Sequence, residues 1–80
     1  MLIGIPKETY PGEKRVALTP KVCAQLIKLG HQVLLEGGAG ESAGFSDPLY
    51  VAAGVSVTHK RREVFERCDL IVQVRGLGAN

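Results

Sequence analysis

Two arginines are the residues whose placement best predicts chemistry. Arg15 lies in a polar segment that follows the apolar run 2–5, and Arg75 directly follows the apolar run 70–74. If both runs are strands of one parallel sheet, both arginines lie beyond strand carboxyl ends, where open α/β sheets bind ligands. A planar guanidinium matches a carboxylate or a phosphate with two hydrogen bonds. The sequence therefore predicts Arg15 and Arg75 as candidates for an anion-binding or substrate crevice.

A structural role for the same arginines is equally open from the residues alone. The Pro11-Gly12 pair is typical of a type II turn, which would return Arg15 towards the end of the first strand. In that position Arg15 can pair with Glu8 or Glu13, while the charged end of Arg75 extends into solvent. The residue types do not separate these two interpretations.

A glycine-rich segment matches a nucleotide-binding fingerprint in letters only. Residues 38–43 read Gly-Ala-Gly-Glu-Ser-Ala, a formal G-x-G-x-x-A. That motif binds pyrophosphate through a helix that begins inside it, and here Gly44 and Ser46-Asp47-Pro48 postpone the helix. We therefore expect a turn-rich connection.

The remaining polar groups predict no catalytic or metal site. The basic run 59–62 at a helix start is typical of a solvated face rather than a phosphate site, and His31 is expected at the surface. Cys23 and Cys68 have no paired ligands at metal spacing and are expected as buried, small apolar residues. No Ser-His-Asp, paired-carboxylate or Cys-His arrangement is recoverable.

Apolar runs alternate with helical segments along the chain. A Thr19 cap followed by Pro20, and a stop at Gly30, favour a helix between them. The predicted strands are 2–5, 32–35, 55–58 and 70–74, and the predicted helices are 20–29, 47–53 and 61–67. This order predicts an α/β fold, a partial doubly wound parallel sheet of Rossmann-like or flavodoxin-like type with about four short strands and right-handed crossovers.

Composition restricts the class of protein further. The 80 residues are 45% hydrophobic and 22% charged, with a net charge of +2 whose signs are dispersed, which is typical of one globular domain and argues against a nucleic-acid partner. The longest uncharged apolar stretch is far shorter than the roughly 20 residues of a membrane span. Because a glycine-rich exit follows the last strand, we expect residues 1–80 to open a larger α/β domain and to be marginally stable alone.

Several short segments of the sequence resemble one known family. They are Ile-Gly-Ile-Pro-Lys-Glu at 3–8, Glu-Lys-Arg-Val-Ala-Leu-Thr-Pro at 13–20, Glu-Gly-Gly-Ala-Gly at 36–40 and Phe-Ser-Asp at 45–47. Together they resemble the N-terminal region shared by alanine dehydrogenase and the alpha subunit of proton-translocating NAD(P) transhydrogenase, over essentially the whole chain. The resemblance implies a two-lobed enzyme in which residues 1–80 begin an incomplete N-terminal domain, with the NAD-binding Rossmann lobe beyond Asn80.

The resemblance also implies roles for the two arginines. In alanine dehydrogenases the position matching Arg15 holds the carboxylate of pyruvate or alanine, and the position matching Arg75 is a lysine at the same substrate. Here that lysine is an arginine, followed by Gly76-Leu77 in place of an acidic residue and proline. Arginine does not replace lysine where a proton is handled, so the chain is more similar to the transhydrogenase alpha subunits. The catalytic histidine and aspartate of the dehydrogenases lie beyond residue 80.

By this resemblance the whole enzyme passes hydride between NAD(H), bound by the full-length subunit, and NADP(H), bound by a beta subunit, coupled to proton movement. The implied partners are the beta subunit, a membrane-spanning subunit and a second alpha subunit. The implied location is cytoplasmic, peripheral to the inner membrane without direct insertion, and residues 1–80 alone would be inactive and bind no cofactor. Two alternatives remain: the N-terminal part of an NAD-dependent alanine dehydrogenase, and a truncated, non-catalytic module.

Overall fold

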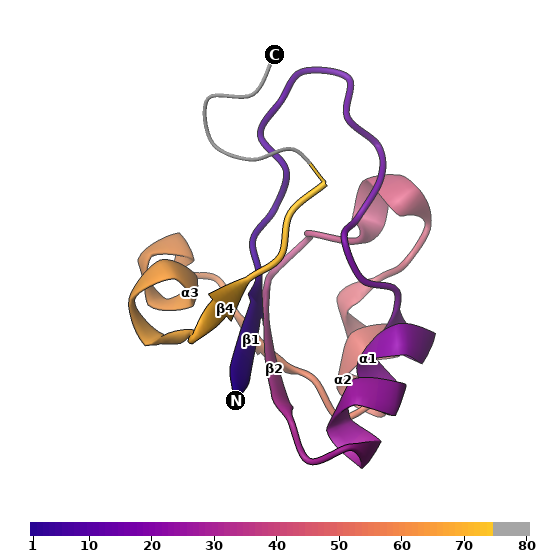
Figure 1. Ribbon diagram of the computed structural model, residues 1–80. Helices are drawn as coiled ribbons and strands as arrows, with labels where there is room; N and C mark the ends of the chain where they lie inside the picture. Colours follow the sequence, from indigo (N-terminus) through magenta and orange to yellow (C-terminus); the bar gives the residue numbers. More distant parts are fainter. Residues whose placement is uncertain (75–80) are drawn as a thin grey trace.

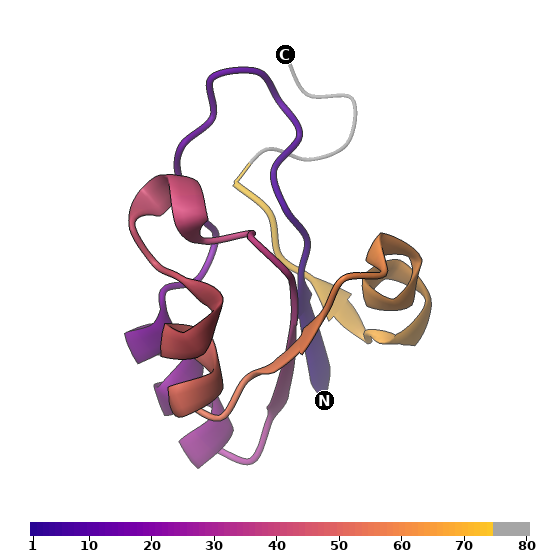
Figure 2. The ribbon, with the colours of Figure 1, turned by 180° about the vertical axis from the view of Figure 1, so that it is seen from behind.

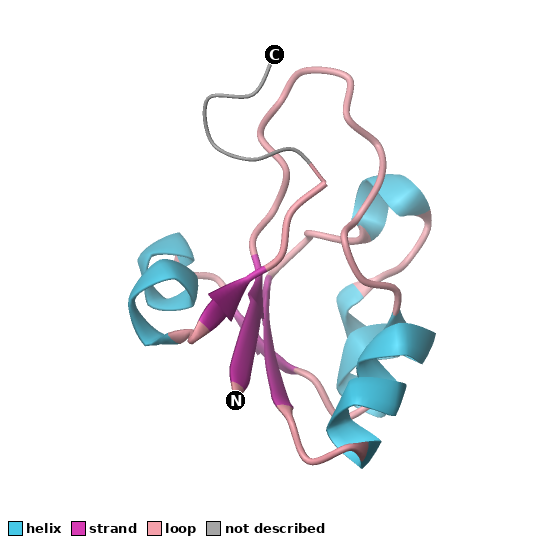
Figure 3. Cartoon of the chain, in the orientation of Figure 1, coloured by secondary structure: helices cyan, strands magenta, loops and turns pink. Residues whose placement is uncertain are grey.

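One parallel sheet with helices on both of its faces organises this chain, whose computed structural model describes residues 1–74 (Figures 1 and 3). The elements are β1 (Leu2–Ile5), α1 (Pro20–Lys28), β2 (Gln32–Glu36), the short 3-10 helix η1 (Glu41–Ala43), α2 (Asp47–Ala52), β3 (Ser56–Thr58), α3 (Arg61–Arg67) and β4 (Leu70–Ile71). The strand order is β3-β2-β1-β4, and every neighbouring pair is parallel.

The chain reverses its direction across the sheet after β3. From β1 it runs outward through β2 to β3, with α1 and α2 on one face, and then returns through α3 on the opposite face to place β4 beside β1 (Figures 1 and 2). This arrangement confirms the predicted partial doubly wound α/β sheet. The switch point between the two windings lies between β1 and β4, the position where such sheets bind ligands.

Both faces of the sheet are buried by apolar side chains. On the α1 and α2 face the core contains Ile5, Leu35 and Tyr50, which are fully buried. On the opposite face Gly4 lies against α3, because a Cβ at Gly4 would stand 2.6 Å from the Cys68 Sγ and 2.9 Å from a Val64 methyl group. Continuous apolar strands of this kind are typical of parallel sheets covered on both sides.

The ends of α1 follow the predicted signals. The Thr19 hydroxyl accepts a hydrogen bond from the Val22 N–H (3.3 Å), Pro20 occupies the first turn, and Gly30 has a φ of +98°. Helix α2 begins where expected, but within residues 1–74 the Ser46 side chain makes no capping hydrogen bond. The carboxylate of Asp47 instead turns to the loop before the helix and accepts from the Gly38 N–H (2.9 Å).

The last strand is shorter than predicted. β4 covers only Leu70–Ile71, although the Val72 N–H still donates to the Gly4 carbonyl (2.9 Å). The next rung of a parallel ladder would need an N–H from residue 6, and Pro6 has none. The pairing with β1 therefore ends, and the expected strand over 70–74 is wrong for residues 72–74.

The expected surface position of His31 is also wrong. Gly30 folds the chain back on the last turn of α1, where the His31 N–H donates to the Leu26 carbonyl (3.1 Å). The ring is half-buried, and its Nδ1 is buried without a hydrogen-bond partner among the described residues.

The two cysteines are free thiols. The predicted burial is confirmed for Cys23, which is fully buried and whose thiol pKa burial raises to about 11, and it is wrong for Cys68, which is half-buried. Residues 1–74 contain no helix that is both long and apolar enough to cross a membrane. The same part of the chain holds no group of three or more His, Cys, Asp or Glu side chains arranged to hold a metal ion.

Candidate functional site

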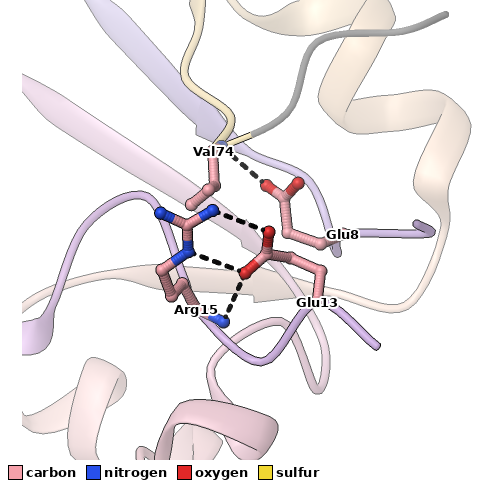
Figure 4. Close-up of polar contacts among 4 residues, drawn as sticks. All are labelled: Glu8, Glu13, Arg15 and Val74. Atoms are coloured by element: carbon pink, nitrogen blue, oxygen red, sulfur yellow. Dashed lines mark hydrogen bonds and ion pairs between the residues drawn. The ribbon is translucent and has the colours of Figure 1, made fainter. Parts of the chain in front are cut away.

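The loop after β1 and the segment after β4 meet at the switch point. The Glu8 carboxylate accepts a hydrogen bond from the Val74 N–H (2.9 Å), although the two residues are 66 positions apart in sequence (Figure 4). Both segments leave the carboxyl end of the sheet (Figure 1). We refer to Glu8, Glu13, Arg15 and Val74 as the switch-point site.

A tight turn brings the second half of the loop back to this site. The Glu13 N–H donates to the Tyr10 carbonyl (3.1 Å), and Gly12 between them has a φ of +82°. This is the geometry that a type II turn requires, since only glycine adopts a positive φ there without strain. The predicted Pro11-Gly12 turn is confirmed, and Arg15 returns to the neighbourhood of Glu8 (Figure 4).

Arg15 is held by Glu13 at two points. Its Nε donates to the Glu13 Oε2 and its Nη2 to the Glu13 Oε1, both at 2.9 Å, and the Arg15 backbone N–H adds a third bond of 2.9 Å (Figure 4). The Glu13 side chain is 4% exposed and the Arg15 side chain 69%. The hydrogen bonds and charge of Glu13 raise the pKa of Arg15. The three hydrogen bonds fix the orientation of the guanidinium, and its remaining Nη1 makes no hydrogen bond within the described residues.

These contacts separate the two interpretations of Arg15 only in part. The pairing with Glu13 that the sequence left open is confirmed, and so is the place of Arg15 beside the carboxyl ends of the strands. The second candidate, Arg75, lies outside the described residues. The structure brings Val74, the residue before it, into contact with the loop that carries Arg15.

The glycine-rich loop is filled by the protein's own side chains. Over residues 38–43 only the 3-10 helix η1 forms, and the Gly38 N–H is already bound to the Asp47 carboxylate. A Cβ at Gly40 would stand 2.5 Å from the Tyr50 Cε2 and 2.8 Å from the Phe45 carbonyl oxygen. The His59 ring occupies the corresponding space beside Gly37. The predicted turn-rich connection is confirmed, and its glycines make room for side chains.

One member of the basic run has a role that the sequence analysis missed. His59, Lys60 and Arg62 are exposed, as predicted for a solvated face. Arg61 instead donates from its Nη1 to the Glu36 Oε1 (2.6 Å) and to the Lys7 carbonyl (2.9 Å), and its guanidinium lies 5.1 Å from the Phe65 ring centroid. The sequence did contain a signal for this pair: Glu36 is the last residue of β2, and Arg61 follows β3, the strand that lies beside β2.

Comparisons with known proteins identify one family. The sequence model of the family described as alanine dehydrogenase/PNT, N-terminal domain, matches residues 4–80. The chain is 53% identical over 76 residues to the NAD(P) transhydrogenase subunit alpha of Cereibacter sphaeroides, covering 95% of this chain and 14% of that protein. It is 41% identical over 75 residues to the alanine dehydrogenase of Methanococcus maripaludis, covering 94% and 20%.

Solved structures show the same fold in both kinds of enzyme. An L-alanine dehydrogenase superposes with a TM-score of 0.87 at 40% identity, covering 91% of this chain and 20% of that one. A transhydrogenase from Sinorhizobium meliloti superposes with a TM-score of 0.86 at 33% identity, covering 94% and 21%. The chain thus spans about a fifth or less of the length of these relatives. On sequence and on fold, it belongs to the alanine dehydrogenase/PNT N-terminal domain family.

Proposed function

We propose that this chain is the amino-terminal segment of the NAD(H)-binding alpha subunit of a proton-translocating NAD(P) transhydrogenase. The observation that carries the proposal is the 53% identity to a transhydrogenase alpha subunit, against 41% to the alanine dehydrogenase of similar coverage. Arg75, which stands where the dehydrogenases have a lysine, supports the same choice. In this proposal residues 1–80 open an N-terminal domain, and the NAD-binding lobe follows them.

The glycine-rich loop does not fit a pyrophosphate group. The one glycine-rich loop that resembles a fingerprint starts no α-helix, and the Gly38 N–H is committed to the Asp47 carboxylate. Pyrophosphate binding needs free amides at the first turn of a helix. In agreement with the family resemblance, the proposal places the dinucleotide in the part of the subunit beyond residue 80, and no step of the reaction is routed through the glycine-rich loop.

Within this function Arg15 is the residue that presents charge at the switch point. Glu13 binds one edge of the guanidinium, through Nε and Nη2, and leaves the side chain 69% exposed, so the outer Nη1 is available to an anion. A preoriented arginine binds a carboxylate or phosphate more favourably than a mobile one, because less side-chain entropy is lost. We propose that Arg15, together with Arg75, orients an anionic ligand or a carboxylate of a partner.

The full-length subunit would transfer hydride between NAD(H) and the NADP(H) of a beta subunit, coupled to proton movement. The proposed assembly contains that beta subunit, a membrane-spanning subunit and two alpha subunits, with this chain on the cytoplasmic side of the inner membrane. Residues 1–74 supply the frame of the switch-point site. They supply none of the groups that exchange hydride.

The test uses the complete polypeptide encoded by the same gene. Assayed with L-alanine and NAD, it is expected to form no pyruvate or ammonia. Combined with the NADP(H)-binding subunit, it is expected to support hydride transfer between the two nucleotides. Robust alanine oxidation without a requirement for any second subunit would overturn the proposal.

Alanine dehydrogenase is the second candidate, and a specific observation favours it. The L-alanine dehydrogenase structure is 40% identical to this chain and the transhydrogenase structure 33%, at nearly equal TM-scores. In that case Arg15 would bind a substrate carboxylate, and Arg75→Lys would raise the rate of alanine oxidation. If the full-length protein oxidises no alanine in either form, this candidate is excluded.

A further inference from the structure

Three hydrogen bonds enclose the backbone of Lys7. The Lys7 N–H donates to the Glu36 Oε1 (2.8 Å), and the Arg61 Nη1 donates both to the Lys7 carbonyl (2.9 Å) and to the same Glu36 oxygen (2.6 Å). We call these three residues the Lys7 clamp. It joins the loop after β1, the last residue of β2 and the first residue of α3.

The clamp lies just after the last residue of β1, where the hydrogen bonds of the sheet end. Pro6 has no N–H, so regular pairing of β1 stops there and the next peptide needs other partners. Glu36 and Arg61 supply an acceptor and a donor to both polar groups of Lys7. Their side chains are 14% and 33% exposed, so these charge-assisted bonds are partly shielded from water.

Arg61 is shaped for this position in a way that lysine is not. Its guanidinium lies 5.1 Å from the Phe65 ring centroid, one helical turn further along α3. A planar cation stacks on an aromatic ring while its edge donates hydrogen bonds, whereas an ammonium is a compact point charge. The ring thus limits the directions in which Arg61 can reach.

The clamp leads directly to the switch-point site. Glu8, the next residue after Lys7, accepts the N–H of Val74, while the N–H of Val72 is held by the Gly4 carbonyl in the sheet. Two nearby amides are therefore fixed by different means. Val72 is held by β1 itself, and Val74 by a carboxylate whose place depends on the Lys7 peptide.

We infer that Arg61 is a positioning residue for the switch-point site: by fixing the Lys7 peptide it sets where Glu8 holds the segment that follows β4. The inference rests on the proposed function in one respect, because it takes this site to be where the full-length protein meets an anionic ligand. An ion pair that merely stabilised the fold would affect the whole domain alike.

The test is hydrogen exchange resolved to single amides in the full-length protein. Arg61→Met keeps an unbranched side chain over Phe65 but removes the guanidinium. We expect the exchange rate of the Val74 amide to rise by about tenfold or more, as for the loss of a hydrogen bond to a charged group. The exchange rate of the Val72 amide should stay unchanged.

Arg67→Met is the matched control. Arg67 lies on the same helix and forms an ion pair with Glu63 (3.3 Å), but it belongs to the last turn of α3 and has no contact with the clamp. It should change neither exchange rate. An unchanged Val74 rate in Arg61→Met, or an equal rise at Val72 and Val74, would overturn the inference.

A second variant covers the case in which Arg61→Met does not fold. Glu36→Gln keeps an acceptor for the Lys7 N–H but removes the charge that holds Arg61, and it should also raise the Val74 rate alone. If it leaves that rate unchanged, the inference fails. The double variant should add little to either single variant, since both act on one ring of hydrogen bonds.

Turnover supplies an independent readout. Arg61→Met should lower kcat of the full-length enzyme, while the dissociation constant for NADH and the activity of Arg67→Met remain unchanged. A parallel loss of NADH binding would instead mean a general folding defect and would count against the positioning role. Because exchange requires neither substrate nor partner subunit, an error in the proposed function would leave the exchange result intact.

Discussion

The loop after β1 and the loop after β2, both at the carboxyl end of the sheet, differ in which groups they present or enclose. The glycine-rich loop after β2 carries the more suggestive sequence, yet Tyr50 and His59 occupy the space beside two of its glycines, and Asp47 accepts the N–H of a third. The loop after β1 matches no nucleotide-binding fingerprint, and it presents the charged side chain of Arg15, 69% exposed, at the switch point. Glycines in a loop identify close approach of another group, and only the structure shows whether that group is a ligand or the protein itself.

The largest effect is expected for Gly40→Ala, which tests the structural role of the glycine-rich loop. The new Cβ would stand 2.5 Å from the Tyr50 Cε2 and 2.8 Å from a backbone oxygen, neither of which can move freely in the core. Overpacking of this kind lowers the free energy of unfolding by about 1–3 kcal/mol, and we expect the upper half of that range. Denaturant unfolding of the full-length protein measures it.

Ser42→Ala is the matched control in the same loop, because Ser42 is exposed. Its effect should stay within about 0.5 kcal/mol. A Gly40→Ala variant as stable as Ser42→Ala would show that Tyr50 does not need the space that glycine leaves at position 40. Nucleotide binding by the full-length protein should be retained in Gly40→Ala at temperatures where it is folded.

Tyr50→Phe has the next largest expected effect. The Tyr50 hydroxyl donates to the Leu18 carbonyl (2.9 Å), and so ties α2 to the end of the loop that carries Arg15. Removing a buried donor leaves that carbonyl without its partner, which costs about 1–2 kcal/mol. The change in the urea midpoint at neutral pH measures this, and an unchanged midpoint would contradict the role of the hydroxyl.

The same variant makes a pH prediction with a definite sign. Burial, followed by the charges of Cys23 and Asp47, raises the pKa of Tyr50 from 10.0 to about 12. The folded state therefore keeps the phenolic proton after the unfolded state has lost it, so this contribution to stability is complete below pH 10 and is lost as pH rises to about 12. Tyr50→Phe should lose less stability than the parent over that interval, measured as unfolding free energy against pH.

The smallest stability effect is expected for Arg15→Ala. Its partner Glu13 keeps a hydrogen bond from the backbone N–H of residue 15 (2.9 Å), and the Arg15 side chain is mostly in water. Exposed ion pairs contribute about 0–1 kcal/mol, and because the Glu13 side chain is only 4% exposed and loses two hydrogen bonds, we expect a loss of about 1 kcal/mol, at the upper end of that range. Lys14→Ala, at the exposed neighbouring position, is the control, and a loss well above that range in Arg15→Ala would mean that the Glu13 pair is structural.

Local signals in the sequence account for much of the fold. Strand β1, the Thr19 cap of α1 and the positive φ of Gly12 follow from residues within a few positions of each other. The doubly wound class also follows, because alternating strands and helices leave few right-handed solutions.

The features that sequence reasoning missed depend on distant partners. β4 is short because Pro6 ends the pairing of β1. Arg61 is partly buried because it pairs with Glu36, the last residue of β2. At the site, sequence reasoning could offer the pairing of Arg15 with Glu13, because the two residues lie close in sequence, but it could not choose between this pairing and an anion site. The contact of Glu8 with Val74 needed the register of the sheet.

The most direct test of the contrast between the loops is the turnover of Arg15→Ala in the full-length protein, compared with Gly40→Ala below its melting temperature. If the loop after β1 carries the functional charge, Arg15→Ala lowers turnover by about tenfold or more, as expected for the loss of a charge-assisted contact, and Gly40→Ala retains it. Unchanged turnover and nucleotide binding in Arg15→Ala would contradict the account and leave the Arg15 and Glu13 pair with a structural role alone.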